Sequence, residues 1–159
     1  MKTEIERKFL VADPSIVGRS TAAPIRMRQA YLSRGKTSVR VRVASDRATL
    51  TVKGPQKGIT RPEYEYEIPN SDANEMIDTL AVTNVIEKDR YLIGEGDFTW
   101  EVDVFKGANQ PLVLAEIELK AEDVAIDLPA WLGEEVSTDV KYLNAYLATH
   151  PYGAWRRRD

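Results

Sequence analysis

Alternation of polar and apolar residues recurs along most of this chain, and it constrains the fold more than any other feature. Successive side chains of a β-strand point to opposite faces, so a period of two predicts strands rather than helices. The pattern predicts eight strands, at residues 3–11, 25–33, 37–44, 47–54, 61–68, 85–93, 97–106 and 112–120. Glycine-containing turns at residues 34–36 and 94–96 keep connections short, which favours antiparallel pairing of neighbouring strands.

Two segments have helical spacing instead. Residues 71–81 offer Ser71 or Asp72 as the N-cap of a helix, and the segment at 139–148 has Thr138 or Asp139 in the same role. Each segment carries apolar residues on one side only. We therefore expect both helices to cover part of the outer surface of the sheet.

The overall composition fits one domain over residues 1–159, because the chain can bury a sizeable core but is short for two domains. The 22 Lys and Arg residues against 25 Asp and Glu residues give a net charge of −3, so we expect no nucleic-acid or membrane partner. The chain has no cysteine, which excludes disulfides and thiolate metal sites. Acidic residues near the start and the lack of a long apolar run predict a cytoplasmic protein.

The polar face of most predicted strands carries charges of mainly one sign. The positions concerned are Glu4, Glu6 and Lys8; Arg40 and Arg42; Lys53; Glu63, Glu65 and Glu67; Lys88 and Arg90; Glu101 and Asp103; and Glu116 and Glu118. An antiparallel sheet with one solvated face is the ordinary explanation of such alternation. However, a surface selected for solubility tends to interleave the two signs. Eight strands are also about the number that closes a small barrel, and a barrel with its apolar side chains outward would hold these charges in its lumen.

Electrostatics indicates what such a lumen would bind. Two like charges 4 Å apart repel by about 4 kcal/mol at an effective dielectric constant near 20. Paired carboxylates are relieved by a divalent cation, which takes oxygen ligands. Arginine and lysine side chains are relieved by a polyanion, and arginine can bind phosphate with two parallel hydrogen bonds. A lumen that holds both kinds of group therefore favours a polyphosphate bound with Mg²⁺ or Mn²⁺.

The stretch EIERK at residues 4–8 resembles the Glu-x-Glu-x-Lys signature of the CYTH superfamily, also called the triphosphate tunnel metalloenzymes. Further segments resemble the family in the same order: QAYL (29–32), VRVR (39–42), TVKGP (51–55), RPEYEYEI (61–68), EKDRY (87–91), WEVDVF (100–105), LAEIEL (114–119) and STDVKYLNAYLA (137–148). The resemblance implies an α+β, mainly β fold. It is an eight-stranded antiparallel β-barrel that forms a charged tunnel, flanked by helices that include a C-terminal helix.

The resemblance also implies roles for individual residues. The expected metal ligands are Glu4, Glu6, Asp103, Glu116 and Glu118. The expected triphosphate-binding residues are Lys8, Arg40, Arg42, Lys53, Lys88 and Arg90. Glu116, Glu118 and Lys8 are the expected catalytic residues, and Glu63 and Glu65 match acids of the tunnel wall whose role stays open.

The activity implied for a small family member is metal-dependent hydrolysis of inorganic triphosphate to pyrophosphate and phosphate. No serine, cysteine or histidine is placed as a covalent nucleophile, so we expect direct attack by water. The alternatives are an enzyme that processes a nucleotide or thiamine triphosphate, such as a class IV adenylyl cyclase or a thiamine triphosphatase, and a non-catalytic polyphosphate-binding module. The acids at the expected metal site argue against the last.

Several residues outside this set have weaker expectations. Arg26 and Arg28 are candidates for extra lumen bases, but an exposed or entrance position is the preferred interpretation for at least one of them. Tyr142 and Asn144 match the C-terminal helix motif of the family, and we interpret them as structural. The tail at 155–159 is expected to be a solvated end. Apolar outer surface left uncovered by two helices could favour a homodimer.

Overall fold

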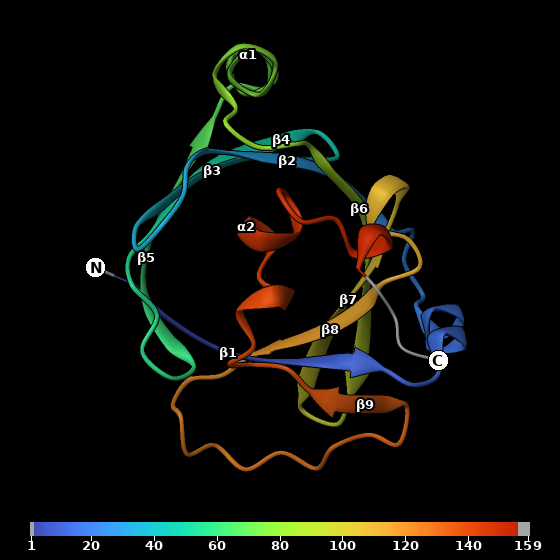
Figure 1. Ribbon diagram of the computed structural model, residues 1–159. Coiled ribbons are helices and arrows are strands. Elements are labelled where there is room, and N and C mark those ends of the chain that lie inside the picture. Colours follow the sequence, from blue (N-terminus) through green and yellow to red (C-terminus); the bar gives the residue numbers. More distant parts are fainter. Residues whose placement is uncertain (1, 156–159) are drawn as a thin grey trace.

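The computed structural model describes residues 2–155, and its strands form a closed antiparallel barrel (Figure 1). The strands are β1 (Lys2–Val11), β2 (Ile25–Ser33), β3 (Ser38–Ala44), β4 (Arg47–Lys53), β5 (Thr60–Ile68), β6 (Ile86–Glu95), β7 (Phe98–Phe105), β8 (Val113–Glu118) and β9 (Leu132–Glu135). They are ordered β5-β4-β3-β2-β6-β7-β8-β1-β9, and β5 also pairs with β1. This last pairing closes β1 to β8 into a ring, with β9 as an extra strand beside β1. All eight predicted strands are confirmed.

The helices are few and short. They are α1 (Asn70–Leu80), α2 (Asn144–Leu147) and the 3₁₀ turns η1 (Pro14–Arg19), η2 (Gly107–Asn109), η3 (Val140–Tyr142) and η4 (Tyr152–Ala154). Within residues 2–155, no helix has the length and apolar character needed to span a membrane.

The barrel is apolar on its outside. On one side, α1 lies across β2, β3 and β4 (Figure 1) and packs Ala73 and Ile77 against Ala30, Val41 and Ala48 of these strands. All five side chains are at most 3% exposed. The three strand side chains at the centre of this contact, Ala30, Val41 and Ala48, are small or β-branched, which lets the helix approach closely. The predicted helix at 71–81 is therefore confirmed, both as a helix and as a cover of the outer surface. The predicted N-cap is wrong: the helix begins at Asn70 after Pro69, so Ser71 and Asp72 lie within its first turn.

A second apolar cluster lies outside β1, β6, β7 and β8. Trp100 is its centre and makes edge-to-face contacts with Phe9 and Trp131, at ring-centroid distances of 5.6 and 5.7 Å. Ile16 of η1 also joins this cluster. Turn η1 and the segment that leads to β9 thus cover the apolar outer surface on this side of the barrel, as α1 covers it on the other.

The C-terminal segment corrects the prediction for residues 139–148. It is not one helix on the outer surface: η3 and α2 are separated by Leu143, whose backbone is extended (φ −69°, ψ 138°), and both lie within the ring of strands (Figure 1). Leu147 packs there in a cluster with the inward-facing Tyr31 and Phe105. The interior is apolar at this end of the barrel, so the apolar face of the segment is buried inside rather than outside.

The last described residue, Trp155, is held by the segment that precedes it. Its indole N–H donates to the carbonyl oxygen of His150 at 2.9 Å, and its ring contacts Tyr142 at a centroid distance of 5.3 Å. Residues 156–159, which carry the basic part of the predicted tail, lie outside the described residues.

We predict that the buried C-terminal segment contributes strongly to stability. Leu147→Ala removes a fully buried side chain from the apolar end of the barrel, which should lower the free energy of unfolding by about 2–5 kcal/mol. Leu80→Ala is the matched control, because Leu80 is also helical but 57% exposed, and it should change stability by less than about 0.5 kcal/mol. Urea denaturation measures both values. Equal effects of the two substitutions would contradict the packing described here.

Candidate active site

A cavity of about 250 Å³ lies inside the barrel. Charged side chains dominate its lining: Lys2, Glu4, Glu6, Lys8, Arg40, Arg42, Lys53, Arg61, Glu63, Glu65, Arg90, Glu101, Glu116 and Glu118. All the predicted site residues therefore line one cavity except Lys88 and Asp103. The strands therefore place their charged side chains inside the barrel and their apolar side chains outside, which is the reverse of the usual arrangement of a soluble sheet.

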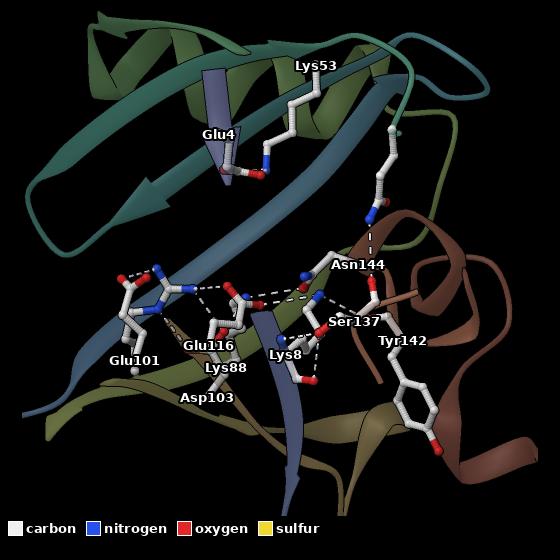
Figure 2. Close-up of polar contacts among 12 residues, drawn as sticks. Glu4, Lys8, Lys53, Lys88, Glu101, Asp103, Glu116, Ser137, Tyr142 and Asn144 are labelled. Atoms are coloured by element: carbon white, nitrogen blue, oxygen red, sulfur yellow. Dashed lines mark hydrogen bonds and ion pairs between the residues drawn. The ribbon is translucent and has the colours of Figure 1, made fainter. Parts of the chain in front are cut away.

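Lys88 and Asp103 lie beside the cavity lining, in a cluster of ion pairs with Arg90 (Figure 2). Asp103 is fully buried, and its carboxylate lies 2.7 Å from Lys88 Nζ and accepts two hydrogen bonds from Arg90, at 2.7 and 2.9 Å. Burial opposes the charge of Asp103, but the two cations outweigh it and hold the pKa of Asp103 below its ordinary value. Arg90 also donates to Glu101 at 2.8 Å. The two carboxylates therefore fix the guanidinium of Arg90 in one orientation.

Lys8 and Glu116 are opposite each other in the register of β1 and β8. Lys8 Nζ lies 3.4 Å from the Glu116 carboxylate and donates to the carbonyl oxygen of Tyr142 at 3.1 Å (Figure 2). Burial opposes the charge of Glu116, but Lys8 and Arg90 outweigh it and hold the pKa of Glu116 well below its ordinary value. The ammonium of Lys8 is thus placed between strand β8 and the C-terminal segment.

Glu4, Lys53 and Glu63 meet where β5 closes onto β1. Lys53 Nζ donates to both oxygens of Glu4, at 2.8 and 2.9 Å, and lies 3.7 Å from Glu63. Burial and a hydrogen bond with Glu4 raise the pKa of Glu63 to about 7. Two carboxylates in contact cannot both ionise without cost, so this pair holds a proton near neutral pH.

Glu6 and Glu118 are also register partners on β1 and β8, with both side chains in the cavity lining. Burial, followed by the negative charge of Glu116, raises the pKa of Glu6 to about 8. The Glu118 side chain is 54% exposed and lies 3.7 Å from Lys2. Oxygen ligands crowded in this way are the chemistry that suits a divalent cation.

The five predicted metal ligands are nevertheless not gathered into one set. Among residues 2–155, no three acidic or histidine side chains are arranged to hold a metal ion as they stand. Glu4 is turned toward Lys53, while the oxygens of Asp103 are taken by Lys88 and Arg90. Glu6, Glu116 and Glu118 remain as acids that share the β1–β8 side of the cavity.

Arg40 and Arg42 give the opposite wall of the cavity a positive charge without full pairing. The Nε of Arg40 is buried and has no hydrogen-bond partner. The carboxylate nearest to this guanidinium is that of Glu65, which lies 3.9 Å from one of its terminal nitrogens. Arg42 donates from Nε to the side-chain oxygen of Gln29 at 2.7 Å, and no carboxylate in the described part of the chain comes within 4.0 Å of it. Burial, with the nearby charges of Arg40 and Arg90, lowers the pKa of Arg42 to about 9. This wall is suited to bind an anion.

Sequence reasoning missed the polar Gln29 on β2, and it named Asn144 on the C-terminal segment as a structural residue. Gln29 faces inward and Asn144 lines the cavity, whereas Arg28 points outward and donates to Asn74 and Asp78 of α1. The preferred interpretation, that at least one of Arg26 and Arg28 has an exposed or entrance position, agrees with the outward direction of Arg28 and with the Arg26 side chain, which is 81% exposed. Ala30 was a signal for which residues of β2 face inward. A small residue at this position fits an outward position under a helix, and it places its neighbour Gln29 on the inward face.

We predict that Glu6 weakens the ligand-free protein at alkaline pH. Because its pKa is raised from 4.5 to about 8, the folded state holds a proton that the unfolded state releases between these values, so stability falls as pH rises through this window. Glu6→Gln should therefore raise the melting temperature at pH 8 in EDTA, by more than it does at pH 5.

The control for this measurement is Glu75→Gln, at an exposed position on α1. It should leave the melting temperature unchanged at both pH values. A melting temperature of Glu6→Gln that is lower than that of the wild type at pH 8 would contradict the account of this carboxylate.

Comparison with known proteins agrees with this geometry. The chain is 48% identical over 153 residues to the inorganic triphosphatase of Acetivibrio thermocellus, covering 96% of this chain and 97% of that protein. It is 39% identical over 153 residues to the inorganic triphosphatase of Nitrosomonas europaea, covering 92% and 97% of the two chains.

Solved structures share the barrel. The crystal structure of the inorganic triphosphatase NE1496 is similar with a TM-score of 0.65 and 36% identity, over 93% of this chain and 95% of that chain. A putative adenylate cyclase from Bacillus halodurans has a TM-score of 0.60 at 16% identity, over 77% and 84% of the two chains, and supports the fold alone. The CYTH domain itself matches residues 2–152. With its closed barrel, its charged interior and this match over nearly its whole length, the chain belongs to the CYTH domain family.

Proposed function

We propose that this protein hydrolyses inorganic triphosphate to pyrophosphate and phosphate. The observation that carries the proposal is the pair of guanidiniums on β3, the buried Arg40 and the half-buried Arg42, which face the cavity without a carboxylate at hydrogen-bonding distance. Cations withdrawn from water without a closely paired counter-ion are costly, and a polyanion supplies the missing negative charge. The names of the two relatives, inorganic triphosphatases at 48% and 39% identity, support the same substrate.

The shape and lining of the cavity favour an inorganic substrate over a nucleotide or thiamine triphosphate. Its volume of about 250 Å³ is below the roughly 300–1,000 Å³ of pockets that enclose drug-sized organic ligands. Within residues 2–155, its lining includes one aromatic ring, that of Tyr31. A base or a thiamine ring has few surfaces here on which to stack.

The bases act mainly by holding the substrate in place. Arg40 and Arg42 bind phosphate oxygens from one wall of the cavity, and Lys8 and Arg90 bind them from the other. Arg90 is already oriented by Asp103. Its side chain therefore loses little conformational entropy when the substrate binds. We assign Lys88 and Asp103 to the support of Arg90, in place of direct contacts with the triphosphate or a metal.

A divalent cation, Mg²⁺ or Mn²⁺, is part of the proposal. Glu6, Glu116 and Glu118, with Glu4, are the residues that would hold it. The pKa of Glu6, which burial and the charge of Glu116 raise to about 8, fits a carboxylate that lacks a closely paired counter-ion. When bound, the cation supplies positive charge that offsets the charge of the phosphate oxygens.

The chemical step is an in-line attack by water. The Glu118 carboxylate, which is loosely held by Lys2 at 3.7 Å, orients the water and takes its proton as the new P–O bond forms at the terminal phosphorus. The bond from that phosphorus to the bridging oxygen breaks, and the electron pair leaves with pyrophosphate. Arg40 and Arg42 stabilise the charge that gathers on the leaving group.

A substrate panel tests this proposal. Phosphate release should be strong from inorganic triphosphate and weak from ATP, thiamine triphosphate and pyrophosphate, and EDTA should abolish it. A cyclic product from ATP would instead make the protein a cyclase. Tight binding of triphosphate without any turnover would make it a binding module.

We predict that Arg42→Gln weakens substrate binding. The substitution removes a cavity-lining charge whose hydrogen bonds to a phosphate are worth about 1.5–3 kcal/mol, so the KM for triphosphate should rise by about 10- to 100-fold. Arg47→Gln is the control, because Arg47 lies on the neighbouring strand with a side chain that is 71% exposed and paired with Glu67. Steady-state phosphate release gives both values, and equal KM values for the two variants would count against the assigned binding wall.

A further inference from the structure

The side-chain amide of Asn144 joins the C-terminal segment to the bases of the barrel. Its oxygen accepts a hydrogen bond from Lys88 Nζ at 3.2 Å and one from the amide nitrogen of Gln29 at 3.3 Å. Gln29 is fully buried, and its own side-chain oxygen accepts from Arg42 Nε at 2.7 Å. A continuous chain of hydrogen bonds therefore runs from α2 through β2 to the guanidinium on β3.

The direction of each hydrogen bond in this chain is fixed. Two donors, Lys88 and Gln29, point at the same atom of Asn144, so that atom must be the oxygen of the amide. Gln29 consequently presents its nitrogen to Asn144 and its oxygen to Arg42. With its amide rotated by half a turn, Gln29 would face Arg42 with a donor, and the guanidinium would lose the one side-chain acceptor that it has among residues 2–155.

The orientation of Arg42 has a consequence for the cavity. Only its Nε is engaged in the described part of the structure, which leaves both terminal nitrogens available to a ligand. A guanidinium binds a phosphate best with two parallel N–H groups, so its planar orientation matters as much as its charge.

We propose that Asn144 is a positioning residue for triphosphate hydrolysis, which orients Arg42 through Gln29. The inference rests on the proposed function and extends it, because it gives the C-terminal segment a part in substrate binding. Asn144 is the first residue of α2, directly after the extended Leu143, and burial of Leu147 holds this helix inside the barrel. Packing of the segment is thereby coupled to the geometry of a base 102 residues away in the sequence.

A double-mutant cycle tests the inference. Asn144→Leu keeps the shape of the side chain but removes the acceptor, and it should raise the KM for triphosphate by about 10-fold in the otherwise unchanged protein. In the Arg42→Gln background the same substitution should change KM by less than about 2-fold, because the group that it orients is gone. A purely structural role would lower stability without this dependence on Arg42.

The control is Asn74→Leu. Asn74 on α1 accepts a hydrogen bond from Arg28 at 3.0 Å outside the barrel, so the same substitution there should leave KM unchanged. If Asn144→Leu does not fold, Gln29→Met breaks the chain at its other member, and the same cycle with Arg42→Gln applies.

Additive effects of Asn144→Leu and Arg42→Gln would overturn the inference, because they would mean that Asn144 acts independently of Arg42. Calorimetric measurement of the Kd for triphosphate in EDTA keeps the two claims apart. A wild-type protein that binds triphosphate but does not hydrolyse it would overturn the proposed function, and the cycle would then be read in Kd.

Discussion

The rest of the structure depends on the neutralisation of charges inside a closed barrel. An ion removed from water is stabilised only when a counter-ion and further hydrogen bonds replace its hydration. Asp103 meets this condition with Lys88 and Arg90, and Glu4 meets it with Lys53. Because these pairs occupy the interior, the apolar face of each strand must be buried outside, where α1 covers one side and η1 with the segment before β9 covers another.

The neutralisation is incomplete in two places, and these are the places where a ligand is needed. On β3, Arg40 and Arg42 have no carboxylate at hydrogen-bonding distance, whereas on the β1–β8 side burial and the charge of Glu116 disfavour ionisation of Glu6. A triphosphate bound with a divalent cation supplies both missing charges at once. Arg40, Arg42 and Glu6, whose charges are incompletely neutralised, are therefore central to the proposed chemistry.

The strands and the family could be predicted from the sequence because alternation and signature residues are local properties. The position of the C-terminal segment could not be predicted. Whether its apolar face packs inside or outside the barrel depends on whether one end of the lumen is apolar. Tyr31 and Phe105 make that end apolar, and only the three-dimensional structure shows that they meet there. The pairing of Asp103 with Lys88 could not be predicted either. Alternation shows which residues of neighbouring strands share a face, but the side-chain rotamers decide which of them reach the cavity. Four expectations stay predictions: Mg²⁺ or Mn²⁺ as the cation, a homodimer, a cytoplasmic location and a single domain over residues 1–159.

The central claim is that the barrel interior binds triphosphate through its own bases. The most direct test is the melting temperature in EDTA as inorganic triphosphate is increased, with sulfate at equal ionic strength as the reference. The account predicts a rise that continues with the logarithm of triphosphate concentration, as expected of a ligand that binds only the folded state, and little change with sulfate. Identical melting temperatures in the two salts would contradict it.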